Sequence, residues 1–527
     1  MICCRRVAML LACVAGLLGA LAGCAGRAPG TAEPVRPAVA GEQLGRLGAV
    51  RIPVTAVASG VGLSQPSAAV PLPDSLLGTV GSRIDSILGD PALRGAEVAL
   101  LVESLAMGQI VCERSADLPL VPASTMKIVT SSLALSILGP AHRFTTDVAT
   151  DGALRGGALE GNLYVRGRGD PSLTTEEVWK LAEEVQILGV ERVTGDVVLD
   201  ASYFDSLSAE PKDDDDGDKA YQARTGALAP NFGSVAVHVR PGEKVGDPAL
   251  VAVAPVTGYV EIVNRATTGS SRRESTIEVA RSLRRGRNTV TVTGRIPAGS
   301  GGGVWNRNVD DPAAYFGALF TEDLAKCGIR IDGCVRKASA PTGARVLVEH
   351  RSKPLAVIVR DLNKYSNNFI AEQLLKAVSA HTLGPPGTTA GGVSLAAALL
   401  RSVGVDSLAF RVADGSGLSR ENLMTPRALL ALSRHMLADF GTAPEFAASL
   451  SVGGIDGTLA RRMGGDDLRG AVRGKTGHLD GVSAVCGLLH TATRGDLLFS
   501  MISNGFECGS PAMRAIEERV LGVLQGL

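Results

Sequence analysis

The residues whose types and spacing could do chemistry lie in the stretch 121–140. Ser124 and Lys127 are three positions apart, at the start of an apolar run with helical spacing that Gly139 and Pro140 end. Residues three apart on a helix share one face. A serine hydroxyl needs a base to take its proton, and a crowded lysine can lose enough basicity to serve. Alone, Ser-x-x-Lys is common, and an ordinary helix start with a solvated lysine is the favoured explanation.

Two later tripeptides favour the chemical interpretation. Ser-Asn-Asn at residues 366–368 gives Ser-x-Asn and precedes a helical run over 369–378, and Lys-Thr-Gly at 475–477 precedes a strand-like run over 482–489. Each tripeptide is common by itself. The three motifs in this order, each beside the expected element, resemble the pattern of the penicilloyl-serine transferases, which include serine peptidases and β-lactamases.

The N-terminal residues 1–24 resemble a bacterial lipoprotein signal peptide. Arg5 and Arg6 precede an apolar run that is too short to span a membrane, and Leu-Ala-Gly-Cys ends at Cys24, the expected lipidation site. A plain secretory signal or a single membrane anchor is the alternative. Residues 25–76 are rich in proline and alanine without clear periodicity, which predicts a flexible tether.

Composition excludes some partners and leaves the cysteines open. Lysine plus arginine and aspartate plus glutamate number 53 each, so no basic excess favours nucleic acid. The aromatic content of 4% argues against a carbohydrate-binding module built on stacked rings. Cys327 and Cys334 are the best local candidates for a disulfide in an oxidising compartment, and free thiols fit equally well. No cysteine spacing resembles a zinc site, and we expect neither a metal nor another cofactor.

The elements that must position the motifs divide into two kinds. Residues 146–344 are rich in short Val/Thr/Gly runs with turn signals between them, which predicts β-rich domains inserted between the first and second motifs. Outside this insertion, helices and strands alternate. The clearest predicted elements there are two strands over 96–114, helices over 391–403 and 425–439, strands over 481–490 and 496–504, and a C-terminal helix over 511–524.

Further blocks strengthen the resemblance. They lie at residues 122–127, 167–171, 414–419, 457–459 and 474–477, and together they resemble the class C low-molecular-mass penicillin-binding proteins, the D-alanyl-D-alanine carboxypeptidase/endopeptidase family. The resemblance covers about residue 76 to the C-terminus. It implies an α+β fold in which residues 77–145 and 345–527 form one catalytic domain, like that of serine β-lactamases and DD-peptidases, with an antiparallel sheet flanked by helices. The inserted β-rich domains would occupy 146–344.

The resemblance also implies a reaction and roles. Ser124 would attack the carbonyl between the last two D-alanines of a peptidoglycan stem peptide, and Lys127 would accept its proton. Ser366 would relay a proton toward the leaving D-alanine nitrogen, with Lys475 sustaining the positive field. Asn368 would hydrogen-bond the substrate backbone and the lysine. Water would release the acyl-enzyme, and penicillin would acylate the same serine.

The remaining implied roles belong to the third motif. The backbone N–H groups of Ser124 and His478 would form the oxyanion hole. Lys475, Thr476 and Gly477 would bind substrate, including its terminal carboxylate. Relatives commonly carry a small hydroxyl residue where this chain has His478, so the carboxylate pocket could lose one hydroxyl contact while the backbone donor survives. A general-base role for the imidazole is not required.

Two other functions remain in view. A serine β-lactamase would share the same catalytic residues, but the class A type also needs a glutamate that activates the deacylating water. The block that would supply it is absent. A catalytically silent protein that binds cell wall is the second alternative. The resemblance places the protein in the bacterial cell envelope, periplasmic and lipid-anchored, with Ala25 weakly favouring the outer membrane because it lacks an acidic retention signal. Its partners would be stem peptides and, as inhibitors, β-lactams. The balance between carboxypeptidase and endopeptidase action stays open.

Overall fold

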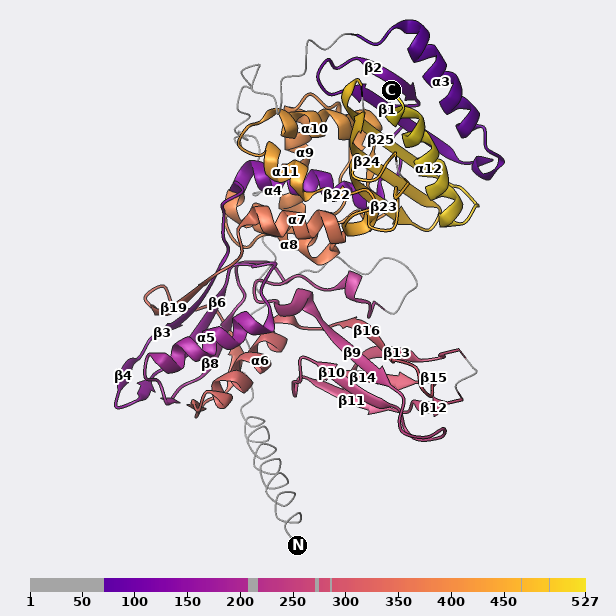
Figure 1. Cartoon of the computed structure of the whole chain (residues 1–527). Helices are drawn as coiled ribbons and strands as arrows, with labels where there is room; N and C mark the ends of the chain where they lie inside the picture. The colour runs from indigo at the N-terminus through magenta and orange to yellow at the C-terminus, as the bar shows by residue number, and fades with distance from the viewer. Residues whose placement is uncertain (1–70, 207–216, 271–273, 285–286, 466, 492) are drawn as a thin grey trace.

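A computed structural model describes residues 71–206, 217–270, 274–284, 287–465, 467–491 and 493–527. The predicted signal peptide and nearly all of the predicted tether lie outside these residues. The two parts of the chain that carry the motifs fold together as a core lobe, made of residues 71–144 and 352–527, and the intervening residues 145–351 form an insertion below it (Figure 1). Within the described part of the chain, none of the helices has the length and apolarity needed to cross a membrane.

The core lobe is built on a six-stranded antiparallel sheet in the order β2-β1-β25-β24-β23-β22. Its strands are β1 (Glu97–Ser104), β2 (Ile110–Arg114), β22 (Ser451–Val452), β23 (Val472–Leu479), β24 (Val482–Thr491) and β25 (Gly495–Asn504). The central strand β25 is apolar on both faces: Leu498 and Ile502 join one hydrophobic cluster, and Phe499 and Met501 join another. A sheet that is apolar on both faces requires cover on both.

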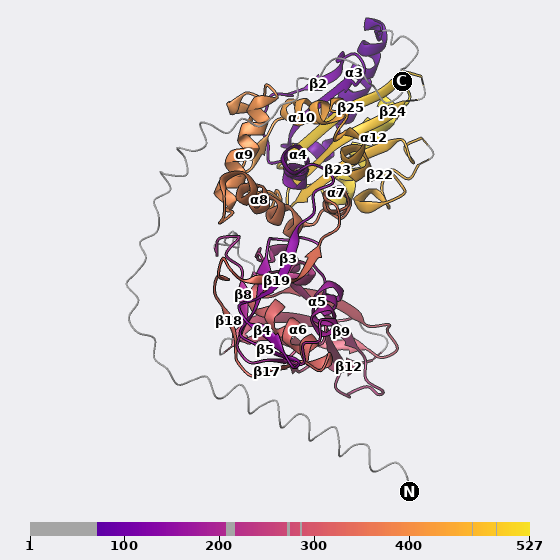
Figure 2. The ribbon, with the colours of Figure 1, turned by 90° about the vertical axis from the view of Figure 1, so that its left-hand side faces the viewer.

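Helices supply this cover. The face of Phe499 and Met501 packs against α3 (Asp74–Leu88) and α12 (Ser510–Gln525). The other face packs against α4 (Lys127–Leu138), α7 (Leu355–Tyr365), α8 (Asn368–Leu383), α9 (Thr389–Ser402), α10 (Pro426–Ala438) and α11 (Ala443–Ser449). Figure 2 shows α8, α9 and α10 on the side of the sheet opposite α12. Helix α4 lies at the centre and is buried on nearly every side, as expected of an interior helix.

The insertion is a set of small sheets around one hydrophobic core with helices α5 (Thr175–Ile187) and α6 (Pro312–Lys326). Its largest sheet has the order β18-β8-β6-β3-β19 and contains β3 (Thr145–Thr150), β6 (Leu163–Gly167), β8 (Val197–Asp200), β18 (Val335–Lys337) and β19 (Arg345–Arg351). Strands β3 and β19 are antiparallel neighbours, and they carry the chain into and out of the core lobe.

The remaining strands of the insertion are short. They form the sheets β17-β7-β5-β4, β10-β9-β16, β11-β14-β13 and β12-β15. Their bounds are β4 (Ala153–Arg155), β5 (Ala158–Glu160), β7 (Arg192–Val193), β9 (Ser234–Arg240), β10 (Leu250–Ala254), β11 (Val260–Asn264), β12 (Thr267–Gly269), β13 (Glu278–Arg284), β14 (Arg287–Thr293), β15 (Arg295–Pro297), β16 (Gly303–Asn308) and β17 (Arg330–Ile331). The predicted α+β fold, an antiparallel sheet flanked by helices with a β-rich insertion between the first and second motifs, is confirmed.

Of the two alternatives that the sequence left open for Cys327 and Cys334, the structure rules out a disulfide between them. Cys327 is a free thiol that ends α6 and packs against the core of the insertion. The residues that follow join two different sheets, β17 beside β7 and β18 beside β8. Cys334 lies between them, where its backbone N–H donates to the Asp196 carboxylate at 2.9 Å. The residues between Cys327 and Cys334 therefore carry the chain from one sheet to the next and do not bring the two cysteines together.

Helix α8 belongs to the core lobe but also holds the insertion. The side-chain amide of Gln373 bonds both backbone groups of Gly226 at 3.0 Å. One turn further along, the buried Lys376 donates to the Asp205 carboxylate at 2.6 Å. Because α8 also carries Asn368 at its start, the helix that holds the second motif is fixed by the insertion.

Candidate active site

Ser124 lies in a short 3₁₀ helix, η2 (Ala123–Met126), that leads directly into α4. Ala123 has a positive φ of 45°, which L-residues adopt at a cost, and this kink turns the chain into the helix. The backbone of Gly417 packs against the Ala123 carbonyl so closely that a Cβ at Gly417 would overlap it. Gly477 approaches from the sheet, where an added Cβ would lie 2.9 Å from the Ser124 amide nitrogen. Two glycines therefore let two other segments reach the serine.

Lys127 is the buried centre of the site. Its Nζ lies 2.8 Å from Ser124 Oγ, 2.7 Å from Asn368 Oδ1 and 2.5 Å from the Ser416 carbonyl oxygen. The lysine is 0% exposed. Burial disfavours the charged ammonium and lowers its pKa to about 7, against the opposing effect of the nearby Asp414 and Glu372 carboxylates. A lysine with this pKa is neutral in a large fraction of molecules near pH 7, as a general base must be.

Glu372 and Asp414 form an acidic support beneath Lys127. Glu372 lies on α8, one turn after Asn368, and accepts hydrogen bonds from the backbone N–H groups of Gly415 and Ser416. Burial, and next the Asp414 charge, raise its pKa to about 7. Asp414 is buried and accepts from the N–H groups of Gly417 and Ser419. The two carboxylates thus shape the loop whose Ser416 carbonyl binds Lys127.

Sequence reasoning gave these two acids no role. The sequence contains signals for both: Glu372 is four residues after Asn368, hence on the same helical face, and Asp414 begins the block 414–419 that resembles the family.

The second motif is held by a strained turn between two helices. Ser366 ends α7 in the left-handed region, with φ 55° and ψ 41°, a conformation that is unfavourable for a residue other than glycine. Asn367 then caps α8, its side chain accepting from the Ile370 N–H at 3.1 Å. Asn368 is the first residue of α8. Its Oδ1 accepts from Lys127, and its Nδ2 donates to the Tyr221 carbonyl at 3.1 Å.

Lys475 joins the second motif to the third. Its Nζ donates to Ser366 Oγ at 2.9 Å and to the Thr476 carbonyl at 2.6 Å. The side chain is fully buried, and burial, followed by the charge of Lys127, lowers its pKa well below the ordinary value. The structure therefore brings the predicted residues together in two adjoining networks, one of Ser124, Lys127 and Asn368, the other of Ser366 and Lys475.

Strand β23 presents the third motif at an open edge. The neighbouring strand β22 pairs only with Arg473 and Gly474, so the following residues of β23 have strand β24 on one side alone. Thr476 Oγ1 donates to Thr458 Oγ1 at 2.8 Å, which adds Thr458 to the site. Sequence reasoning noted the block at 457–459 but assigned it no role.

The His478 side chain turns away from the serine. Side chains alternate along a strand, so Lys475 and Gly477 share the face of Ser124, and Thr476 and His478 share the other. His478 Nε2 lies 2.8 Å from Ser510 Oγ at the start of α12. Partial burial lowers the pKa of the imidazole. The His478 side chain therefore does not face Ser124, and only the backbone of His478 could contact a substrate bound there.

Comparisons with known proteins identify the family of the chain. The model of the D-Ala-D-Ala carboxypeptidase 3 (S13) family matches residues 80–526. The D-alanyl-D-alanine carboxypeptidase of Actinomadura sp. (strain R39) is 37% identical over 519 residues, covering 93% of this chain and 92% of that protein. The crystal structure of penicillin binding protein 4 from Haemophilus influenzae matches with a TM-score of 0.74 at 25% identity, covering 84% of this chain and 98% of that one.

The same Haemophilus protein in complex with a β-lactam matches over the same shares of the two chains with a TM-score of 0.70. The matched region contains all three motifs and the insertion between them, as the resemblance to the class C low-molecular-mass penicillin-binding proteins predicted. The chain belongs to the D-Ala-D-Ala carboxypeptidase 3 (S13) family.

Proposed function

We propose that this protein is a serine-type D-alanyl-D-alanine carboxypeptidase that cleaves peptidoglycan stem peptides through an acyl-enzyme on Ser124. The observation that carries the proposal is the pairing of Ser124 with Lys127: the two side chains are 2.8 Å apart, and burial lowers the pKa of the lysine to about 7. A nucleophile beside a base of matched pKa is the requirement for this reaction. Family membership and the reaction named for the Actinomadura relative support the substrate class.

Acylation begins when neutral Lys127 Nζ takes the proton of Ser124 Oγ as that oxygen attacks the carbonyl carbon between the last two D-alanines. The carbonyl oxygen becomes an oxyanion, for which the backbone N–H groups of Ser124 and His478 are the proposed donors. The close approach of Gly477 to the Ser124 amide supports this assignment, because it puts the backbone of β23 beside that of the nucleophile.

The tetrahedral intermediate then collapses with loss of D-alanine. Ser366 gives its hydroxyl proton to the leaving nitrogen, and Lys475, hydrogen-bonded to Ser366 Oγ, is placed to replace that proton. Lys475, Thr476 and Gly477 are the proposed binding groups for the terminal carboxylate. The carboxylate would lie at the open edge of β23, which side chains from both faces of the strand can reach, and Thr458 holds the Thr476 hydroxyl.

On the other side of the bond, Asn368 hydrogen-bonds the acyl half of the substrate and keeps Lys127 in place. The proton that Lys127 took in acylation passes to the Ser366 and Lys475 network, where it makes up for the proton given to the departing D-alanine, and Lys127 is neutral again. Lys127 then deprotonates the water that attacks the ester carbonyl, and it returns this proton to Ser124 Oγ as the shortened peptide leaves.

The experiment is the mass of the intact protein after brief exposure to penicillin. One stable adduct, mapped by digestion to the peptide with Ser124, is expected, and Ser124→Ala should abolish it. Rapid turnover of penicillin without an adduct would identify a β-lactamase instead, and no reaction at all would identify a silent wall-binding protein. Weighing the products from linear and cross-linked muropeptides then tests carboxypeptidase and endopeptidase action separately.

We also propose that the protein is exported to the periplasm and anchored by lipid on Cys24, with the outer membrane favoured. Cys24 and nearly all of the tether lie outside the described residues, so the proposal rests on the Leu-Ala-Gly-Cys pattern and on Ala25. The diacylglycerol that a lipoprotein carries on this cysteine has two acyl chains, which is enough for stable anchoring. Cys24→Ser should move the protein to the soluble periplasmic fraction, and a wild-type protein found soluble would contradict the anchor.

A further inference from the structure

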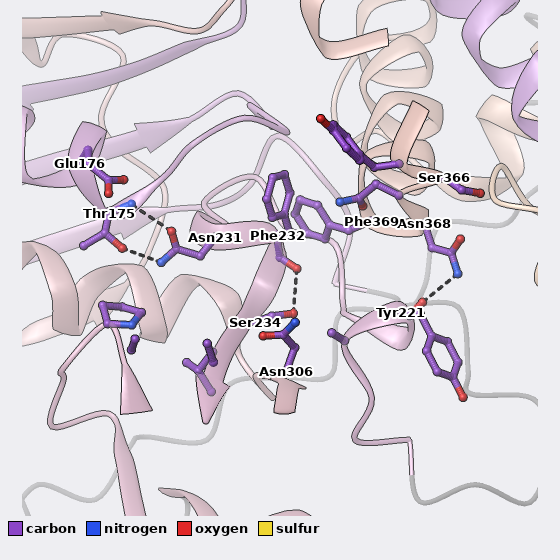
Figure 3. Close-up of a pocket in the computed structure, with 17 residues that line it drawn as sticks. Thr175, Glu176, Tyr221, Asn231, Phe232, Ser234, Asn306, Ser366, Asn368 and Phe369 are labelled. Atoms are coloured by element: carbon purple, nitrogen blue, oxygen red, sulfur yellow. Dashed lines mark hydrogen bonds between the residues drawn. The ribbon is translucent and has the colours of Figure 1, made fainter. Parts of the chain in front are cut away.

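A groove of about 660 Å³ extends from the second motif into the insertion (Figure 3). Ser366 and Asn368 line its end at the active site. Thr175 and Glu176, at the start of α5, line its opposite end. Asn306 of β16 lies between the two ends of the groove. The groove is therefore continuous with the catalytic residues, yet most of its wall comes from the insertion, for which the reaction itself gives no use.

The floor of the groove is one face of the sheet β10-β9-β16. Ala236 of β9 pairs with Ala254 of β10 on one side and with Asn306 of β16 on the other, and all three line the groove. The opposite face is anchored, because Val237 and Val239 are fully buried in the core of the insertion. Small side chains on a fixed sheet leave open space above it, and a larger residue at Ala236 would occupy that space.

Aromatic rings gather at this groove although they are scarce in the chain. Tyr221, Phe232 and Tyr365 are 51%, 39% and 72% exposed, and all three line it. Phe369 lies beneath Phe232, with the ring centroids 6.2 Å apart in an edge-on arrangement that braces the outer ring. Aromatic walls with a few polar groups between them are typical of small-molecule sites. The low aromatic content argues against a separate carbohydrate-binding module, but not against one local cluster.

The charge of the groove limits what could enter it. None of the described residues that line it is lysine or arginine, and Glu176 is its only carboxylate among them. A peptide segment that carries free carboxylates would find no cation there and one repelling charge. A neutral ligand with hydroxyl and amide groups would find acceptors and donors in Glu176 and Asn306, and apolar rings on which to pack.

The position of the groove selects a part of the substrate. The proposed carboxylate-binding residues Lys475 and Thr476 do not line it, whereas Asn368, on the acyl side of the cleaved bond, does. The stem peptide therefore leaves the active site toward the groove. Four extended residues reach about 14 Å. Beyond them the stem peptide is joined to the glycan strand, whose N-acetylated amino sugars are largely neutral and carry hydroxyl and amide groups.

We infer that this groove binds the N-acetylated amino-sugar residues of the glycan strand that carries the stem peptide. The inference rests on the proposed carboxypeptidase function, since it uses the direction in which the substrate lies. Sugar C–H faces pack on the exposed aromatic rings, and hydroxyl and acetamido groups hydrogen-bond to Asn306 and Glu176. The insertion thereby favours a stem peptide attached to glycan over the same peptide free in solution.

The test compares kcat/KM for a stem pentapeptide attached to its N-acetylglucosaminyl-N-acetylmuramyl disaccharide with kcat/KM for the pentapeptide alone. In the wild type, the disaccharide should raise the value about tenfold, equivalent to one modest set of contacts. Ala236→Phe should fill the groove and bring the ratio near one. The matched control is Ala252→Phe, an exposed alanine on the same face of β10 that does not line the groove, and it should keep the ratio.

A second variant, Asn306→Ala, removes an amide from an exposed position where folding is not at risk, and should lower the ratio several-fold. Equal kcat/KM with and without the disaccharide in the wild type would overturn the inference. It would also be overturned if a sugar-free, cross-linked peptide dimer gained the tenfold advantage and lost it in Ala236→Phe. Labelling of Ser124 by penicillin is scored in every variant, so a failure of the proposed function appears as loss of labelling and not as a change in the ratio.

Discussion

The pKa of Lys127 is set by two opposing effects, burial and nearby negative charge. Full burial costs the ammonium its hydration and lowers the pKa, while Asp414 and Glu372 favour the charged form and limit the fall. Without the two acids the lysine would be neutral but poorly placed, because they also hold the loop that binds its Nζ through the Ser416 carbonyl. Basicity and position therefore come from the same residues.

The first prediction is a pH profile. Because only neutral Lys127 can take the Ser124 proton, the rate of acylation by penicillin should rise with pH through about 7 and fall as pH drops below it. Lys127→Ala should lower the rate by about 10²–10⁴ and remove this titration. Stopped-flow measurement between pH 5 and 9 checks both, and a rate independent of pH in the wild type would refute the role of the lysine.

Glu372→Gln tests the acidic support. Removing a negative charge that raises the pKa of Lys127 should move the midpoint of the acylation profile to lower pH. The glutamine keeps one oxygen that can accept from the Ser416 N–H, so a purely structural role would change the rate without moving the midpoint. Glu349→Gln, an exposed charge on β19, is the control and should leave the profile in place. An unmoved midpoint in Glu372→Gln would exclude the electrostatic role.

At the residue scale, recognisable motifs are what allow a sequence to point to side chains that lie close together. The structure places Ser124, Lys127 and Asn368 in one network, and Ser366 and Lys475 in an adjoining one. The roles of Asp414 and Thr458 depend on distances between segments far apart in the chain, which spacing cannot supply. The orientation of the His478 ring was within reach, because alternation along a strand puts it on the side opposite Lys475.

At the scale of elements, the nucleophile depends on a close contact between two loops. Gly417 has a φ of 79°, and its Cα faces the Ala123 carbonyl with no room for a side chain. Elements themselves were largely predictable: the helix expected over 425–439 is α10, begun by the Thr425 cap, and the strand expected over 496–504 is β25. The pairing of β25 with β1 was not, since partners about 400 residues apart leave no local signal.

Gly417→Ala tests this contact. A Cβ there should push η2 out of place, lowering the rate of penicillin acylation at least tenfold, in addition to the cost of about 1–2 kcal/mol for a left-handed alanine. Gly404→Ala is the matched control, with a similar φ of 85° but open space around the added Cβ. Gly404→Ala should be less stable than the wild type in thermal unfolding, but its rate of penicillin acylation should be unchanged. Equal rates in the two variants would mean that the contact does not position Ser124.

The whole molecule is organised around α8, which belongs to the core lobe and also bonds the insertion. All three motifs lie outside the insertion, so the sequence suggests a catalytic domain that could stand without it. The structure adds contacts that sequence could not predict, because they join residues of unrelated pattern: Gln373 bonds Gly226, and buried Lys376 bonds Asp205. The same helix presents Asn368 to the site. Weakening the contacts between α8 and the insertion should therefore affect Asn368 of the second motif.

Asp205→Asn should uncouple the unfolding of the insertion from that of the core lobe. Lys376 would lose an anionic partner in a buried place, a loss of about 1–3 kcal/mol of stability. Both tryptophans, Trp179 and Trp305, lie in the insertion, so their fluorescence reports on it, whereas penicillin labelling of Ser124 reports on the core lobe.

In urea, the two signals should be lost together in the wild type, as in a single cooperative transition, and should separate in Asp205→Asn. Glu160→Gln, which removes an exposed ion pair with Arg155 inside the insertion, is the control and should shift neither transition by more than about 0.5 kcal/mol. Coincident and unshifted transitions in Asp205→Asn would show that the ion pair does not couple the lobes. Separation in the wild type would show that the insertion and the core lobe unfold independently, so that α8 would not transmit the state of one to the other.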